Sequence, residues 1–244
     1  MLKHAGVREG GKIVEDALGF RPVFLDPPPA QDSVRTALFR ARRQLVGLVF
    51  YAAQLEGSPY TFPEVQTLLD GITVGGHRLE DERLILNLKS AWKTLFEWVA
   101  GSTLWLDKGI FCALHAQVGF EEALTWGAFR DGPVSIPGTI HRPPPPEELD
   151  GIFQRETAVL AAMEHPYHRT INFFLFGSLH QFFYDANKRT SRLMASGILL
   201  ENRYDLLNIP AAHRLEFNQR MVEFYDSRDG RTMGEFLGRL ARES

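Results

Sequence analysis

Cysteine is almost absent from this chain of 244 residues, in which Cys112 is the only one. A single cysteine excludes an intrachain disulfide framework and fits a reducing compartment. Long apolar runs are missing too: residues 1–21 lack the apolar segment of a signal peptide, and no stretch reaches the roughly 20 residues of a membrane span. We therefore expect a cytoplasmic protein with no membrane partner.

An excess of basic charge is also missing. The chain has 27 Lys and Arg against 30 Asp and Glu, a formal net charge of -3. Broad nucleic-acid binding needs a clustered basic surface, so this balance argues against a nucleic-acid partner. The 44% of hydrophobic residues can build a substantial core in a chain of this length. Because the chain has no overall basic charge, any phosphate-binding site must be confined to a small cluster of residues.

Apolar residues recur at helical spacing through most of the chain. Gly57 is placed to end the first long helix, and Asp107 to cap another at its N-terminus. Thr61 and Glu64 form the pattern of a capping box around a short helix. We expect helices at 32–56, 63–69, 79–99, 107–115, 147–164, 170–183, 188–202, 211–225 and 233–242.

Residues 128–146 do not follow helical spacing. Val134, Ile136 and Ile140 are separated by proline and glycine, and the stretch ends in four prolines at 143–146. Propensity leaves a short, irregular β-hairpin and a plain loop equally open. The exposed edge of such a hairpin could accept a strand from a partner.

The most unusual stretch is 181–192, which reads QFFYDANKRTSR. Lys188, Arg189 and Arg192 fall in the first turns of a predicted helix, where the helix dipole favours anions instead. The three cations make sense if an anion binds among them, because free backbone N–H groups and arginine side chains bind phosphates. A solvated basic loop is the alternative that charge alone leaves open.

Residues 184–192, preceded by an aromatic helix, resemble the active-site loop of Fic (Fido) proteins, HPFx(D/E)GNGRxGR. Residues 52–57, AAQLEG, resemble the inhibitory-helix motif S/T-xxx-E-G/N, and 58–69 continue as in such proteins. Residues 127–146 resemble the segment that carries their β-hairpin flap. The resemblance covers roughly 32–202, and it implies an all-α fold, a Fic-type helical bundle with a short β-hairpin flap.

The resemblance also implies a division of the chain and an activity. We expect an N-terminal arm at 1–30, an inhibitory-helix region at 31–70, a Fic core at 71–202 and a C-terminal helical extension at 203–244. Family members mostly transfer AMP from ATP to a hydroxyl on a protein. The resemblance therefore implies a protein adenylyltransferase that uses Mg²⁺ and ATP on a protein target or on itself, and that could form a homodimer.

The family motif assigns a role to each residue of the loop. Asp185 matches the carboxylate that holds the magnesium ion. Backbone N–H groups, with Asn187, would hold the α-phosphate, and Arg189 and Arg192 would neutralise the rest of the triphosphate. The implied nucleotide-binding set is Ala186, Asn187, Lys188, Arg189, Thr190 and Arg192. The implied target-docking residues of the flap are Val134, Ser135, Ile136 and Ile140.

The first departure from the family pattern concerns catalysis. Gln181 takes the place of the histidine that removes the proton from the attacking hydroxyl. An amide has no basic lone pair near neutral pH, and general-base assistance is worth a factor of roughly 10² to 10⁴. His180 is adjacent, but on a regular helix it points about 100° away, so only a local π-bulge would bring it in.

Two further departures affect the transferred group and the regulation. Ala186 and Lys188 replace glycines, and residues 186–190 also resemble Doc-like members, which phosphorylate their targets, whereas Arg192 matches the adenylylating branch. Ala52 replaces the Ser or Thr of the inhibitory motif, but Glu56 remains and would compete with the γ-phosphate for Arg192.

Three functions therefore remain open from the sequence. The first is an adenylyltransferase that is inhibited by Glu56 and weakened by Gln181. The second is an inactive relative that binds a nucleotide or a partner. The third is AMP removal or Doc-like phosphotransfer at the same loop.

Overall fold

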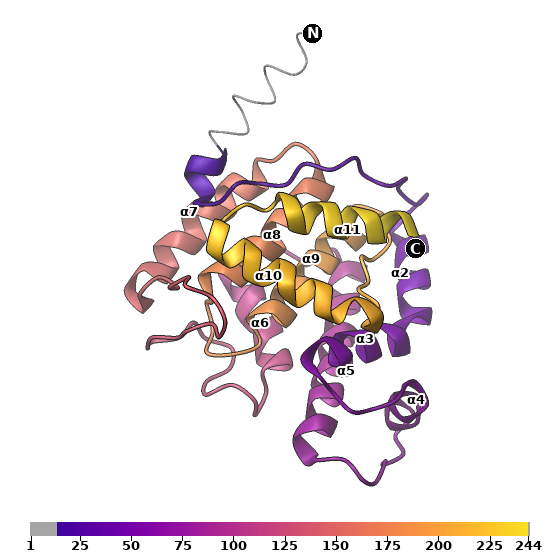
Figure 1. The fold of residues 1–244 in the computed structure, drawn as a ribbon. Helices are drawn as coiled ribbons and strands as arrows, with labels where there is room; N and C mark the ends of the chain where they lie inside the picture. Colours follow the sequence, from indigo (N-terminus) through magenta and orange to yellow (C-terminus); the bar gives the residue numbers. More distant parts are fainter. Residues whose placement is uncertain (1–13, 244) are drawn as a thin grey trace.

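The computed structural model describes residues 14–243, so residues 1–13 of the arm expected at 1–30 lie outside the described residues. The described chain is helical, without a β-strand, and its one isolated β-bridge joins Arg21 to Asp229. None of these helices has the length and apolar character needed to cross a membrane. Residues 14–18 are helical. The helices that follow are α2 (Val34–Arg43), α3 (Leu45–Glu56), α4 (Phe62–Leu69), α5 (Leu79–Ala100), α6 (Lys108–Val118), α7 (Leu149–Ala161), α8 (Pro166–His180), α9 (Asn187–Glu201), α10 (Arg214–Ser227) and α11 (Arg231–Glu243), with short 3-10 turns at Pro146–Glu148 and Ala211–His213 (Figure 1).

The helices α8 and α9 form the centre of the molecule, with the other helices around them (Figure 1). Every residue from 170 to 180 in α8 and from 193 to 200 in α9 is buried. A helix that is buried on all sides belongs to the core of a domain. The C-terminal helices join this pair through aromatic contacts such as Phe174 on Phe217, with ring centroids 6.2 Å apart. The loop between α8 and α9 is therefore held on a rigid frame.

Most helix boundaries follow the signals in the sequence. Gly57 ends α3 with φ 93°, and the Asp107 side chain accepts a hydrogen bond from the N–H of Ile110 at 2.8 Å, so both predicted caps are confirmed. The single helix predicted at 32–56 is instead two helices, which break at Gln44 with φ −95° and ψ 5°. No glycine or proline marks this break, which is why helical spacing alone did not reveal it.

The β-hairpin expected at 128–146 does not form, and the segment is the plain loop that propensity had left open. Side chains replace strand pairing as partners of its backbone. The N–H of Ile140 donates to the Asp226 carboxylate of α10 at 2.9 Å. The Arg130 guanidinium donates to the carbonyl of Pro144 at 2.5 Å. Because proline has no N–H to donate, the proline-rich part of this loop could not have supplied a regular ladder.

Candidate functional site

The loop that joins α8 to α9 comprises residues 181–186. Gln181 (φ 49°) and Ala186 (φ 59°) adopt the left-handed conformation at its two ends. Residues other than glycine avoid this conformation, at a cost of roughly 1–2 kcal/mol per residue. The Fic motif has glycine at the place of Ala186, and the backbone geometry explains that preference.

Asn187 fixes the shape of this loop. Its Oδ1 accepts a hydrogen bond from the N–H of Phe183 at 2.9 Å, and its Nδ2 donates to the carbonyl of Phe183 at 2.8 Å and to Oε1 of Gln181 at 3.1 Å. The amide is thus engaged with the loop itself. Its predicted contact with an α-phosphate stays a prediction.

A cavity of about 200 Å³ lies between the loop, the end of α3, the flap and α10. It brings together most of the residues that the sequence singled out. Val134, Ile140 and Arg192 do not line it, and Thr190 is buried with its hydroxyl donating to the carbonyl of Ala186 at 2.9 Å. The lining residues are Glu56, Ser135, Ile136, Pro137, Gln181, Tyr184, Asp185, Ala186, Asn187, Lys188, Arg189 and Tyr225.

Glu56 places a carboxylate among the cations of the loop. Its Oε1 lies 3.5 Å from Nη2 of Arg192, and its Oε2 lies 4.0 Å from Nε of Arg189. Burial opposes the charged form, but the coulombic effect of Arg189, Arg192 and Lys188 outweighs it and holds the pKa of Glu56 below its usual value. The carboxylate is therefore ionised at neutral pH and occupies the position that an anion would need.

Arg189 is surrounded by three carboxylates. Its Nη1 donates to Oε2 of Glu122 at 2.6 Å, its Nη2 lies 3.7 Å from Oδ1 of Asp185, and its Nε, with Glu56 at 4.0 Å, has no hydrogen-bond partner within the described chain. Glu122 is itself held by Nδ2 of Asn87 on α5 at 2.9 Å. One edge of the guanidinium is thus anchored, while Nε remains for another acceptor.

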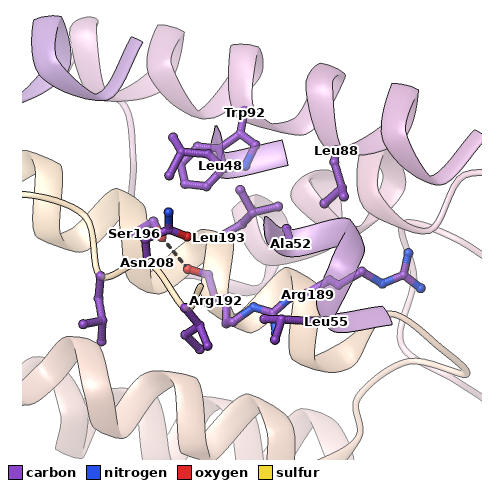
Figure 2. Close-up of a pocket in the computed structure, with 12 residues that line it drawn as sticks. Leu48, Ala52, Leu55, Leu88, Trp92, Arg189, Arg192, Leu193, Ser196 and Asn208 are labelled. Atoms are coloured by element: carbon purple, nitrogen blue, oxygen red, sulfur yellow. Dashed lines mark hydrogen bonds between the residues drawn. The ribbon is translucent and has the colours of Figure 1, made fainter. Parts of the chain in front are cut away.

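Arg192 is the least satisfied cation of the site. Figure 2 shows it with Arg189 beside Ala52 and Leu55 of α3, around a small cavity of about 40 Å³. The guanidinium lies over the ring of Phe217, 5.4 Å from its centroid, and among the described residues neither Nη1 nor Nη2 has a hydrogen-bond partner. Burial lowers the pKa of Arg192, with Glu56 acting against it. A buried guanidinium that is paired only loosely, with Glu56 at 3.5 Å, is a site that an anion would stabilise.

Gln181 and His180 point to different places. The Gln181 side chain lines the cavity, where its Nε2 donates to the carbonyl of Ser178 at 2.6 Å. The imidazole of His180 instead lies in the core, with its Nε2 2.8 Å from the Glu156 carboxylate of α7. The helix stays regular to its end, without the π-bulge that would redirect His180.

His115 is a site residue that sequence reasoning missed. Its ring stacks on Phe183 with centroids 3.7 Å apart, and its Nδ1 accepts the N–H of Gly127 at 3.1 Å. Because Nδ1 accepts, Nε2 carries the proton and donates to the carbonyl of Asp185 at 3.2 Å. Burial lowers the pKa of His115 to about 4, so the ring is neutral at pH 7.

Sequence reasoning missed three more residues of the site. Glu122, Arg130 and Tyr225 lie far from the loop in sequence and belong to no local motif. Arg130 donates from its Nε to the carbonyl of Gln181 at 2.6 Å, and Tyr225 lines the cavity from α10. These residues come close to the loop only when the chain is folded, so no pattern in the sequence indicates them.

The donor set suits magnesium bound together with phosphates. The Asp185 side chain is 63% exposed and lines the cavity. The described residues contain no cluster of three or more His, Cys, Asp or Glu that could hold a metal ion alone. Mg²⁺ usually binds through one or two carboxylates and the phosphates of its nucleotide, so a single carboxylate beside unpaired arginine atoms fits it.

The chain is similar to known proteins in sequence and in fold. Residues 105–199 match the sequence model of the Fic/DOC family. The protein adenylyltransferase Fic of Drosophila mojavensis is 24% identical over 200 residues, which are 79% of this chain and 39% of that protein. The chain thus spans about two fifths of the length of that curated relative.

Solved structures show the same fold. Fic-1 from C. elegans superposes with a TM-score of 0.73 at 17% identity, over 99% of this chain and 71% of that one. The IbpA Fic2 structure in complex with adenylylated Cdc42 gives a TM-score of 0.53 at 14% identity, over 96% of this chain and 77% of that one. Residues 105–199 therefore match the Fic/DOC family, and the described helices share the fold of solved Fic proteins.

Proposed function

We propose that this chain is a protein adenylyltransferase of low activity, which uses Mg²⁺ and ATP and is held back by Glu56. One observation carries the proposal: Arg189 and Arg192 both lie beside the Glu56 carboxylate, at 4.0 Å and 3.5 Å, next to the loop of residues 181–186. A carboxylate and a phosphate compete for the same guanidinium groups, so a triphosphate would have to displace Glu56.

The reaction is an in-line displacement at phosphorus. The target's hydroxyl oxygen attacks the α-phosphorus, the bond from that phosphorus to the bridging oxygen breaks, and pyrophosphate leaves. The backbone N–H groups at the start of α9 would stabilise the charge that develops on the α-phosphate. Arg189 and Arg192 would hold the departing phosphates, and Mg²⁺ bound through Asp185 would neutralise them.

Proton removal is the weak step of this mechanism. Gln181 can orient a hydroxyl but cannot accept its proton, which must pass to water as the new bond to phosphorus forms. Its Oε1 and Nε2 already contact Asn187 and Ser178. We therefore expect turnover roughly 10² to 10⁴ times slower than with a histidine in this place.

A second function is supported by the same contacts of Gln181. Because the amide is engaged within the loop, the chain could bind ATP without transferring any group. In this function the arginines and the loop bind the nucleotide, but no group is transferred.

The partner is proposed to be a protein hydroxyl, on another chain or on a second copy. The Fic neighbour in complex with adenylylated Cdc42 supports a protein target. A cytoplasmic location and a possible homodimer remain predictions from the sequence.

The test is transfer of label from ATP with magnesium, in separate reactions with α-labelled and γ-labelled nucleotide. The native chain, Glu56→Gly, Gln181→His and the double variant are compared, with Glu56→Gln to separate loss of charge from a change in the end of α3. We expect α-label on protein, weak in the native chain, stronger in Glu56→Gly and strongest in the double variant.

Other outcomes select other functions. No label in any variant, together with a melting temperature that ATP raises only when Arg189 is present, would establish the binding function instead. Transfer of γ-label alone would establish Doc-like phosphotransfer. Release of AMP from an adenylylated protein, without α-label transfer, would establish AMP removal.

A further inference from the structure

A second cavity lies at the opposite end of α9 from the loop. The loop precedes Asn187, the first residue of α9, whereas this cavity is lined by Glu201, the last. Its volume is about 480 Å³, compared with about 200 Å³ at the loop. This is the size range of small-molecule sites.

The Glu201 carboxylate in this cavity lacks a counterion. No cation of the described chain lies within ion-pair distance of it, and the N–H of Leu104 is its hydrogen-bond donor. Burial raises the pKa of Glu201 to about 7. The residue also sits at the C-terminal end of a helix, where the dipole adds partial negative charge. Both effects disfavour the carboxylate unless a cation is bound.

The other charged side chain of the cavity, Arg169, does not fill this role. Its Nε donates to the carbonyl of Leu160 at 3.2 Å, and its Nη2 donates to the carbonyl of Met163 at 3.0 Å. The guanidinium thus caps the end of α7. It neutralises that helix end and leaves Glu201 unpaired.

An aromatic side chain completes the lining. Trp105 is 66% exposed, and no ring or cation of residues 14–243 stacks on its indole. Aromatic faces attract cations, most strongly those of tryptophan. Met194 and Ile198 of α9 supply an apolar wall beside it.

We propose that this cavity binds a small organic cation, with its ammonium group between Glu201 and Trp105 and its apolar part against Met194 and Ile198. The ammonium group supplies the charge that Glu201 lacks, and the indole face and the apolar wall favour an organic cation over a metal ion. This site is separate from the loop and does not depend on the proposed transfer activity.

Choline is a suitable probe, because its charge does not change with pH. Its neutral isostere, 3,3-dimethylbutan-1-ol, has the same shape without the charge. Each is titrated into the full chain while the indole N–H resonances are followed by NMR, and Trp105→Leu assigns the relevant signal. We expect choline to shift the Trp105 signal and to bind at least about tenfold more tightly than the isostere.

Variants test the role of each group. Glu201→Gln, which keeps the side-chain shape, should weaken choline binding about tenfold, and circular dichroism shows whether it remains folded. Glu97→Gln removes a nearby exposed carboxylate that does not line the cavity, and it should leave binding unchanged. Binding by the native chain should strengthen from pH 6 to pH 8 as Glu201 ionises. Equal binding of the isostere, or unchanged binding in Glu201→Gln, would overturn the proposal.

Discussion

At the scale of single residues, carboxylates from three separate segments decide whether Arg189 is available to a phosphate. Glu56 comes from α3, Glu122 from the loop after α6, and Asp185 from the motif itself. Only Glu122 lies at hydrogen-bonding distance. Glu122 therefore sets the position of the guanidinium, whereas Glu56 competes for the part that faces the cavity.

We expect Glu122→Gln to lower the free energy of unfolding by about 1.5–3 kcal/mol, because a buried guanidinium loses its hydrogen-bonded charge partner. Glu121 provides the matched control: its side chain is 45% exposed and pairs with Arg83 at 2.8 Å on the surface. Glu121→Gln should change the stability by no more than about 0.5 kcal/mol. Urea denaturation of both variants measures the difference, and similar losses in both would contradict the assigned role of Glu122.

His115 gives a prediction of pH dependence. Its pKa of about 4 in the folded chain lies below the usual 6.5, so the unfolded chain binds this proton more readily. The stability linked to His115 is complete above pH 6.5 and is lost as the pH falls toward 4. Among the eight histidines of the chain, NMR should find one ring, absent in His115→Gln, that stays neutral until about pH 4. Titration of this ring near pH 6.5 would be inconsistent with its buried, stacked position.

The motif residues of the site could be predicted from the sequence because they are contiguous. Asp185, Ala186, Asn187 and Arg189 all line the same cavity, as the motif led us to expect. His115 could not be predicted, because its function depends on stacking and on two backbone contacts that form only in the folded chain.

At the scale of elements, capping residues predicted the ends of helices better than the spacing of apolar residues did. Gly57 marks a helix end because a residue without a side chain adopts positive φ easily. Asp107 marks a helix start because its carboxylate accepts a hydrogen bond from a free backbone N–H. The break at Gln44 has no capping signal in the sequence, and the loop at 128–146 is held by tertiary contacts. In the flap, the Asp226 carboxylate of α10 occupies the N–H of Ile140, which strand pairing would have used.

We expect Asp226→Ala to release the tip of this flap without unfolding the protein. Asp226 also accepts from the Thr139 hydroxyl, so its loss frees two donors at the tip. Hydrogen exchange at residues 139–141 should become faster, while the melting temperature changes little because the contact is exposed. Glu223→Ala, one turn earlier on the exposed face of α10, should leave exchange in the flap unchanged. Equal exchange in the two variants would mean that Asp226 does not hold the flap.

At the scale of the whole molecule, the site depends on the close approach of α8 and α9. The loop begins at the end of one helix and finishes at the start of the other, so their separation sets its geometry. Gly177 permits this close approach, because a Cβ atom there would lie 2.2 Å from Oγ of Ser191 on α9 and 3.4 Å from the ring of Phe111. Helical spacing predicted the two helices, but not how closely they approach.

We therefore expect Gly177→Ala to destabilise the fold by about 1–3 kcal/mol, because the added methyl group overpacks the contact between the helices. Gly47→Ala in α3 is the matched control, since a Cβ atom there meets nothing closer than 3.9 Å. That change should stabilise the chain by up to about 1 kcal/mol through helix propensity. Opposite signs in chemical denaturation would show that packing between α8 and α9 outweighs propensity at Gly177. A gain of stability in both variants would mean that α8 and α9 can separate at little cost.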